Sequence, residues 1–171
     1  MSDENSEYVK MTVTGLTIDP FTNMPIVILK DSVQKLALPI WIGLIEASSI
    51  ATEIEKIELN RPMTHDLMKT IMDHLQGKVE KVEISDLIDN TFFATIYVIA
   101  HDGTVFKIDS RPSDALAIAL RTKADIFVNR KVIDKSRKLE NIQHSEEQMK
   151  SQKWAEILDN LGPEDFGKYK M

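Results

Sequence analysis

The sequence predicts an α+β fold: a single domain with a mixed, mostly antiparallel sheet and inserted helices. Apolar and polar residues alternate from residue 8 to about 42 and again from 78 to 109, which is the period of β-strands. Between 44 and 76 apolar residues recur every three or four positions, which is the period of a helix. The length of 171 residues suits one domain with its own core.

Seven segments are expected to form strands: 8–18, 26–30, 35–42, 78–88, 91–100, 104–109 and 125–129. Pro39 lies inside the third segment and has no N–H to donate to a ladder, so it predicts an edge position, a bulge or a break. Asp89-Asn90 and His101-Asp102-Gly103 have the composition of hairpin turns, and they predict antiparallel pairing of the strands on either side.

Three helices are expected within the domain. The first covers about 44–58, and the second begins near Thr64, a good N-cap, and is closed by Gly77. The apolar residues of the second helix are expected to form its buried face: Leu67, Met68, Ile71, Met72 and Leu75. The third helix, in "DSRPSDALAIALRT", is apolar all round after its first turn, which is typical of a helix enclosed by the core.

The domain organisation follows from these segments. Residues 1–7 are expected to be disordered, and residues 8–138 to form the folded domain. Residues 139–171 are expected to be a charged C-terminal helical extension with one amphipathic helix near 145–161. The basic stretch 129–138 is interpreted as a solvated loop face.

Composition excludes several classes of protein. The net charge is −6, from 21 Lys and Arg against 27 Asp and Glu, which argues against a protein that coats nucleic acid without a metal. The absence of cysteine excludes disulfides, thiolate metal sites and cysteine nucleophiles. No apolar run reaches the roughly 18 residues of a membrane span, and the N-terminus is acidic, unlike a secretory signal. A cytoplasmic protein is expected.

Polar residues gather around the start of the enclosed helix. Asp109 ends a strand, and Arg111, Ser113 and Asp114 follow within five residues. Helix N-termini are common binding sites because their backbone N–H groups point toward anions. A purely structural interpretation stays open, in which Asp114 caps the helix and pairs with Arg121, seven positions on along the same face.

A second stretch, "RPMTHD", repeats the same order of residues: Arg-Pro, then a hydroxyl residue, then Asp at a helix start. We therefore expect Arg61, His65 and Asp66 to meet the first cluster in one pocket, with Glu46 at its edge. Capping and surface roles remain the alternative for His65, and a solvated stripe remains the alternative for Glu46. There is no P-loop, dinucleotide-binding glycine pattern or HExxH motif.

Four motifs, in order, resemble the bifunctional nuclease family found in bacteria, archaea and plants: "LPIWIGLIEASSIA", "NRPMTHDLMKTIM", "TFFATIYV" and "DSRPSDALAIALR". The resemblance covers about residues 8–133. It implies an α+β domain that tends to self-associate and a nuclease activity on DNA and RNA. The family's polar positions are matched here by Glu46, Arg61, His65, Asp66, Asp109, Arg111, Ser113, Asp114 and Arg121.

Three hypotheses about function remain open. The first is a nuclease of low sequence specificity, in which Asp109 and Asp114 hold Mg²⁺ or Mn²⁺, aided by Asp66 or Glu46. Arg111 would then clamp the phosphate, and His65 or a metal-bound water would start the displacement. Arg61, Ser113 and Arg121 are expected to help bind substrate. The second hypothesis is a non-catalytic module that binds an anion or nucleotide, and the third is a structural cluster.

Self-association as a homodimer is also expected. The segments 8–42 and 91–100 contain more apolar strand surface than two or three short helices can cover. "TFFATIYVIA" is apolar on both faces, as in a strand that is covered on both sides. Nucleic acid would be a transient partner.

Overall fold

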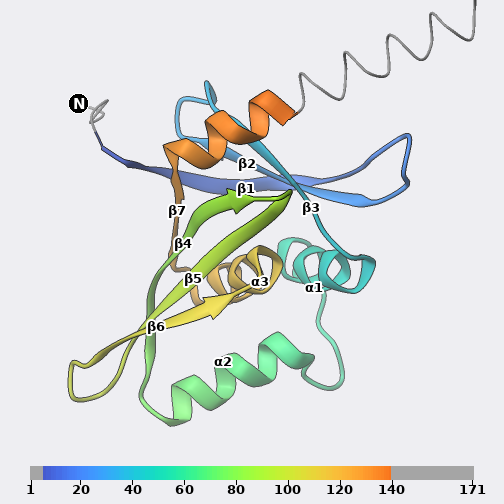
Figure 1. Cartoon of the computed structure of the whole chain (residues 1–171). Coiled ribbons are helices and arrows are strands. Elements are labelled where there is room, and N and C mark those ends of the chain that lie inside the picture. The colour runs from blue at the N-terminus through green and yellow to red at the C-terminus, as the bar shows by residue number, and fades with distance from the viewer. Residues whose placement is uncertain (1–5, 140–171) are drawn as a thin grey trace, which may run out of the picture. The chain divides into compact units, whose positions relative to one another are not determined.

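A computed structural model describes residues 6–139. Its strands form one seven-stranded sheet in the order β3-β2-β1-β7-β4-β5-β6 (Figure 1). All neighbouring strands are antiparallel except β4 and β7, which are parallel, so the predicted mixed sheet of an α+β domain is confirmed. The strands are β1 Tyr8–Ile18, β2 Pro25–Asp31, β3 Ala37–Trp41, β4 Lys78–Ile88, β5 Thr91–Ile99, β6 Val105–Ser110 and β7 Asp125–Asn129.

Two expectations from the sequence, one about an edge strand and one about a hairpin turn, are confirmed. β3, which contains Pro39, is an edge strand, where a missing N–H costs no ladder hydrogen bond. Asp89 and Asn90 both have positive φ between β4 and β5, as a tight hairpin turn requires.

The helices are α1 Leu44–Ile54, α2 Thr64–His74 and α3 Pro112–Thr122, and residues 130–139 are also helical. α1 is shorter than the predicted 44–58, because the chain leaves the helix at Glu55 and turns at Lys56, which has a φ of 53°. The solvated loop predicted for 129–138 is wrong. The helix there is held to β4 because Lys131 and Lys135 both bind the carboxylate of Asp86.

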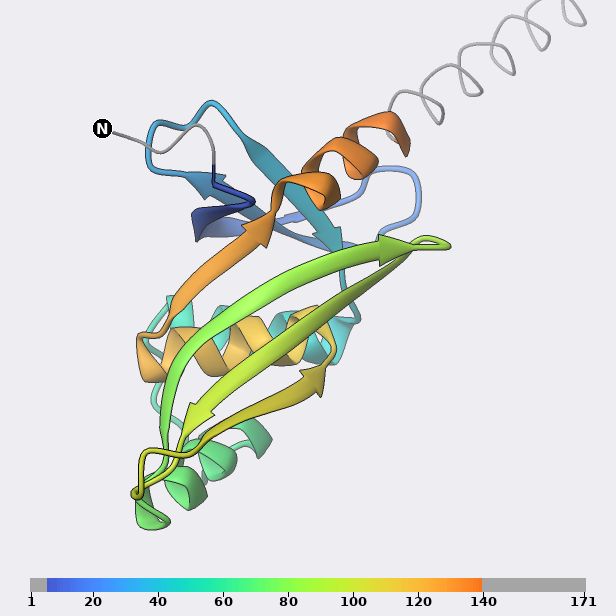
Figure 2. The ribbon, with the colours of Figure 1, turned by 60° about the vertical axis from the view of Figure 1, so that its left-hand side comes forward.

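The core lies between the sheet and α3. The residues from Ala115 to Ala119 are all buried, so the prediction of an enclosed helix is confirmed. α3 packs on the sheet face formed by Val82 and Ile84 of β4 and Ile96 of β5, and α1 lies beside it (Figure 2). Because α3 is enclosed by the core, the backbone of its first turn, which carries the polar residues, is held in place.

The predicted buried face of α2 is wrong. Leu67, Met68, Ile71 and Leu75 are 41% to 73% exposed, and His65 is the one buried residue of this helix. The reason is the position of α2, which packs against α3 and not over the sheet. Its apolar residues therefore point away from the core.

Within one chain, β5 is covered on one face. Ala94, Ile96 and Val98 are buried, but Phe93 on the other face is exposed, and Thr95 and Tyr97 are only half-buried. Tyr97 is held there by a hydrogen bond from its hydroxyl to Glu83, which raises the pKa of Tyr97 to about 12.

The residues up to Ser136 form one compact unit. A second unit begins at Arg137, and the helix expected near 145–161 lies outside the described residues. Within residues 6–139 no helix is long and apolar enough to cross a membrane.

Candidate functional site at the junction of three helices

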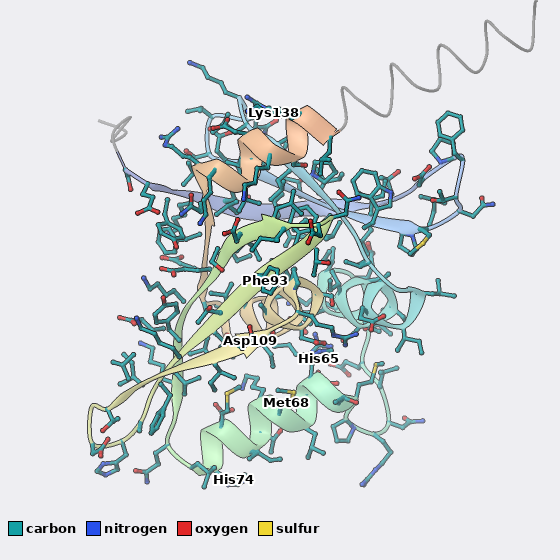
Figure 3. The ribbon with its side chains drawn as sticks, viewed as in Figure 1. His65, Met68, His74, Phe93, Asp109 and Lys138 are labelled. Atoms are coloured by element: carbon teal, nitrogen blue, oxygen red, sulfur yellow. The ribbon has the colours of Figure 1, made fainter. Side chains whose placement is uncertain are left out.

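The two polar motifs meet where α1, α2 and α3 come together, as the sequence predicted. Nε2 of His65, at the start of α2, lies 3.0 Å from Oδ1 of Asp114 in the first turn of α3. Nδ1 of the same ring lies 2.8 Å from Oγ of Ser49 in α1. Figure 3 shows His65 at the end of α2 nearest to α1 and α3. One imidazole therefore connects three helices.

The hydrogen-bonding pattern indicates how the protons are arranged. A carboxylate accepts hydrogen bonds, so Nε2 of His65 donates to Asp114. In the neutral ring Nδ1 then accepts from the hydroxyl of Ser49. Ser49 is 2% exposed, so this hydroxyl cannot reach a polymeric substrate. The hydrogen bonds among Ser49, His65 and Asp114 therefore hold the three helices together, and they do not make Ser49 a nucleophile that His65 activates as a base.

Arg111 is the exposed cation of the junction. Its Nε and Nη2 donate to the two oxygens of Asp114 at 2.7 and 3.1 Å, and its Nη1 donates to Oε1 of Glu46 at 2.7 Å. The hydrogen bonds to Asp114 and Glu46 raise the pKa of Arg111. Its side chain is still 65% exposed. Three of its five N–H groups are used within the described residues, which leaves two that can bind a ligand.

Burial opposes the ionisation of Asp114, but the hydrogen bonds from Arg111 and His65 outweigh it. The pKa of Asp114 consequently lies below its usual value. Asp114 is therefore a carboxylate whose two oxygens are already occupied by protein donors.

The predicted pair between Asp114 and Arg121 is wrong. Arg121 binds Oδ1 of Asp66 at 2.6 Å and donates to the carbonyl oxygens of Ala117 and Ser49. Burial raises the pKa of Asp66, but the hydrogen bond from Arg121 and the backbone N–H of Met63 bring it below the usual value. Arg121 is almost fully buried and ties α3 to α1 and α2 through these contacts.

Asp109 does not join the cluster. It is opposite Thr95 in the ladder of β5 and β6, while Ile108 is opposite Ile96, which is buried under α3. Side chains alternate between the faces of a sheet, so Asp109 points to the face away from α3 and Asp114. The expected metal pair of Asp109 and Asp114 is thus not brought together. Within residues 6–139 no three His, Asp or Glu side chains are grouped as metal ligands.

Two cavities flank the junction. One of about 290 Å³ lies at the first turn of α3 and is lined by Glu46, Arg111 and the buried Ser113, together with Trp41 and Phe92. The other, of about 450 Å³, lies on the side of the α1–α2 loop. Arg61 lines this second cavity with Asp66 and Arg121, so it is separated from Arg111.

The sequence has relatives among known proteins. The model of the bifunctional nuclease domain matches residues 27–141. The chain belongs to this family. An uncharacterized protein of Mycobacterium tuberculosis is 33% identical over 163 residues, which cover 92% of this chain and 97% of that protein.

Plant relatives carry the nuclease name. "Bifunctional nuclease 1" of Oryza sativa subsp. japonica is 26% identical over 109 residues, 63% of this chain and 33% of that protein. "Bifunctional nuclease 2" of Arabidopsis thaliana is 27% identical over 97 residues, 56% of this chain and 30% of that protein. The matched region is therefore about a third of each plant protein.

In this member of the bifunctional nuclease family, the sequence did not predict the part that two residues play in the site. Ser49 falls on the same stripe of α1 as Glu46, three positions on, and its residue type and spacing did not indicate a contact with His65. At Gly43, the N-cap of α1, the side chain of Glu46 lies so close to the backbone that a Cβ would collide with its Oε2. The sequence feature that could have indicated Gly43 is its position, directly between the alternating strand pattern and the helical pattern.

Proposed function

We propose that this chain cleaves phosphodiester bonds in DNA or RNA with low sequence specificity. The observation that carries the proposal is Arg111, an exposed guanidinium held between Asp114 and Glu46 at the mouth of a cavity. A guanidinium with two remaining N–H groups matches two phosphate oxygens. The nuclease names of the plant relatives support the choice of a phosphodiester.

The roles follow from exposure and contact. Arg111 binds the phosphate, assisted by the backbone N–H groups that begin α3, and the buried Ser113 lines the same cavity. Glu46 is the carboxylate beside Arg111 in the same cavity, and it accepts a proton from the attacking water. The water oxygen bonds to phosphorus, the bond from phosphorus to the leaving oxygen breaks, and that oxygen takes a proton from solvent. His65 and Asp114 position Arg111.

The described residues do not fit a resident divalent metal. Both oxygens of Asp114 are engaged, and Asp109 points to the other face of the sheet. No step is therefore assigned to a metal. Cleavage that is lost in EDTA and restored by Mg²⁺ or Mn²⁺ would indicate a metal that arrives with the nucleic acid.

The experiment compares Glu46→Gln with Glu53→Gln, purified in parallel and incubated with labelled DNA and RNA. Glu53 lies two turns further along α1, outside the cavity that contains Arg111. Glu46→Gln should reduce the cleavage rate by about 100-fold, the usual effect of losing a general base, and Glu53→Gln should not. Equal cleavage by both variants and the wild type would show that Glu46 is not the base and would contradict the proposal.

A second candidate function is a non-catalytic module that binds an anion or nucleotide. It is favoured by one observation, that Ser49, His65, Asp114 and Arg111 all have partners within the junction. This candidate predicts that a labelled oligonucleotide binds at low salt, with loss of binding in Arg111→Gln, and is never cleaved.

A further inference from the structure

The cavity beside Arg111 has aromatic walls as well as polar ones. Phe92 of β5 and Trp41 at the end of β3 line the same space of about 290 Å³ as Arg111. Neither aromatic residue belongs to the core, since Phe92 is half-buried and Trp41 is 38% exposed. A site that bound only a phosphate would need the cation and no ring. The walls therefore indicate a ligand that carries a flat apolar group next to its phosphate.

The ring of Phe92 points to the side of the sheet that carries α3. Side chains alternate between the two faces of a strand, so Phe92 shares a face with Ala94 and Ile96, which are buried. This is the face on which α3 packs. Phe92 therefore lies on the same side of the sheet as the first turn of α3, and it lines the cavity together with Ser113 of that turn.

Trp41 is held in place by a residue outside the cavity. Its indole Nε1 donates a hydrogen bond of 2.8 Å to Oδ2 of Asp19, which directly follows β1. Its backbone is fixed as well, because Trp41 is opposite Ile26 in the ladder of β2 and β3. A side chain that is ordered before a ligand arrives loses little conformational entropy on binding. Trp41 thus supplies a preformed rim of the cavity.

The size of the cavity suits a single nucleotide. Its volume of about 290 Å³ lies at the lower end of the range for small-molecule sites, roughly 300–1,000 Å³. The bases of a duplex are paired and stacked, so a base reaches such a site only after it has been flipped out, which costs free energy. An unpaired base enters without that cost.

Asn90 gives the cavity a polar edge. It is exposed in the turn between β4 and β5, where its φ is 60°, and it lines the cavity beside Phe92. Its carboxamide contains both donors and an acceptor, so it can hydrogen-bond to the edge of any base. Such a group does not select one base, which agrees with the low sequence specificity of the proposed nuclease.

We propose that this cavity is a nucleobase subsite, in which the unpaired base next to the phosphate bound by Arg111 stacks on the ring of Phe92, with Trp41 as its rim. The inference rests on the proposed function, because it takes the phosphate at Arg111 as its fixed point. It adds a substrate class, single-stranded nucleic acid, and a residue that determines this specificity. Stacking on an aromatic side chain tolerates any sequence, since every base has a π-face.

The first test measures binding and does not depend on cleavage. Trp154→Phe leaves Trp41 as the single tryptophan, since the sequence contains two, and the fluorescence of Trp41 then reports a base in the cavity. A short oligothymidylate should quench this fluorescence, whereas an abasic sugar–phosphate chain of the same length and charge should not. No quenching by the oligothymidylate, or equal quenching by the abasic chain or by a duplex, would overturn the subsite.

Three further variants in the same background locate the stacked base. Phe92→Ala should weaken the binding of the oligothymidylate by about 5- to 150-fold, the usual effect of losing one stacking ring. Phe92→Tyr keeps the ring and should restore most of the affinity. Phe93→Ala is the matched control, because Phe93, labelled in Figure 3, is the next residue of β5 and points to the opposite face. Equal affinities of Phe92→Ala and Phe93→Ala would overturn the proposal.

Cleavage kinetics separate the subsite from the proposed function. Phe92→Ala should raise the KM for a single-stranded oligonucleotide with little change in kcat, because the stacked base contributes to binding and not to the chemical step. If Arg111→Gln abolishes cleavage but Phe92→Ala leaves the KM unchanged, the nuclease function stands and the subsite is overturned. If the protein cleaves nothing but the oligothymidylate alone quenches Trp41, the subsite stands and the proposed function is overturned.

Discussion

At the scale of single residues, exposure separates the groups that hold the site from the group that can bind a ligand. His65 and Arg121 are buried and link the three helices, whereas Arg111 reaches solvent from the same cluster. His65 and Arg111 come from the two copies of one repeated motif, so the motif does not tell structural from binding positions. The distinction follows from the partners that each side chain finds.

Ser49→Ala tests whether the imidazole link stabilises the fold. The variant leaves Nδ1 of His65 as a buried acceptor without a donor, which should lower the free energy of unfolding by about 1–3 kcal/mol. Urea unfolding measures the change. Ser48→Ala is the control, because Ser48 is exposed in the same turn of α1 and should change stability by less than about 0.5 kcal/mol. Equal effects of the two variants would show that the link contributes nothing.

The ionisation of Asp114 predicts an acid-sensitive part of the stability. Its pKa is lower in the folded state than the value of about 3.9 expected in the unfolded chain. The stabilisation is then fully present above the unfolded pKa and is lost as the pH falls through the folded pKa. Between about pH 7 and pH 3 the wild type should lose more unfolding free energy than Asp114→Asn, measured by urea titration. Identical losses would mean that the pairing with Arg111 and His65 has no energetic effect.

At the scale of elements, the start of α1 places Glu46. The extended backbone of Gly43, with φ of −70° and ψ of 159°, is open to any residue, so alanine would meet no backbone strain there. Its Cβ would instead occupy the place of Oε2 of Glu46. The glycine thus lets the carboxylate fold back toward Arg111.

Gly43→Ala should displace the Glu46 carboxylate without removing its charge. The cleavage rate should fall, though by less than the roughly 100-fold expected for loss of the base itself. Gly15→Ala is the matched control, since a Cβ at Gly15 meets nothing within 4 Å. If both variants cleave at the wild-type rate while melting normally, Glu46 is not the base.

The periodicity of the sequence predicted the strands and helices well, but it predicted poorly which of their faces are covered by other elements. The strands and α3 were predictable because alternation and an unbroken apolar run report burial directly, as at Ala115 to Ala119. The apolar stripe of α2 predicted a buried flank, but periodicity does not show whether another element of the domain lies over that flank. Leu67 and Ile71 are exposed because α2 packs on α3 by its other side.

The site was predictable in part for the same physical reason. The repeated Arg-Pro and Asp pattern predicted that "RPMTHD" and "DSRPSD" lie close together, and His65 and Asp114 are in contact. The partner of Arg121 was not predictable, because spacing along one helix ignores the neighbouring helix that carries Asp66. Asp109 was misplaced because its nearness to Asp114 in sequence hides the alternation of a strand.

At the scale of the whole molecule, an acidic chain must attract a polyanion through a local feature. The net charge of −6 provides no general attraction for nucleic acid. Helices that begin together at the junction contribute partial positive charge, and Arg111 adds a full one. We therefore expect binding that is weak and local and that falls only modestly with added salt, because one cation neutralises about one phosphate.

The most direct test of the central claim is the kcat/KM for cleavage of a labelled single-stranded oligonucleotide by Arg111→Gln. If Arg111 holds the phosphate, the value should fall by about 100-fold or more relative to the wild type, as when one donor to the reacting phosphate is removed. The variant should still unfold cooperatively, because Arg111 is 65% exposed, and Asp114 keeps its hydrogen bond from His65. A variant that cleaves as fast as the wild type would contradict the claim that this junction is where the phosphodiester bond is bound.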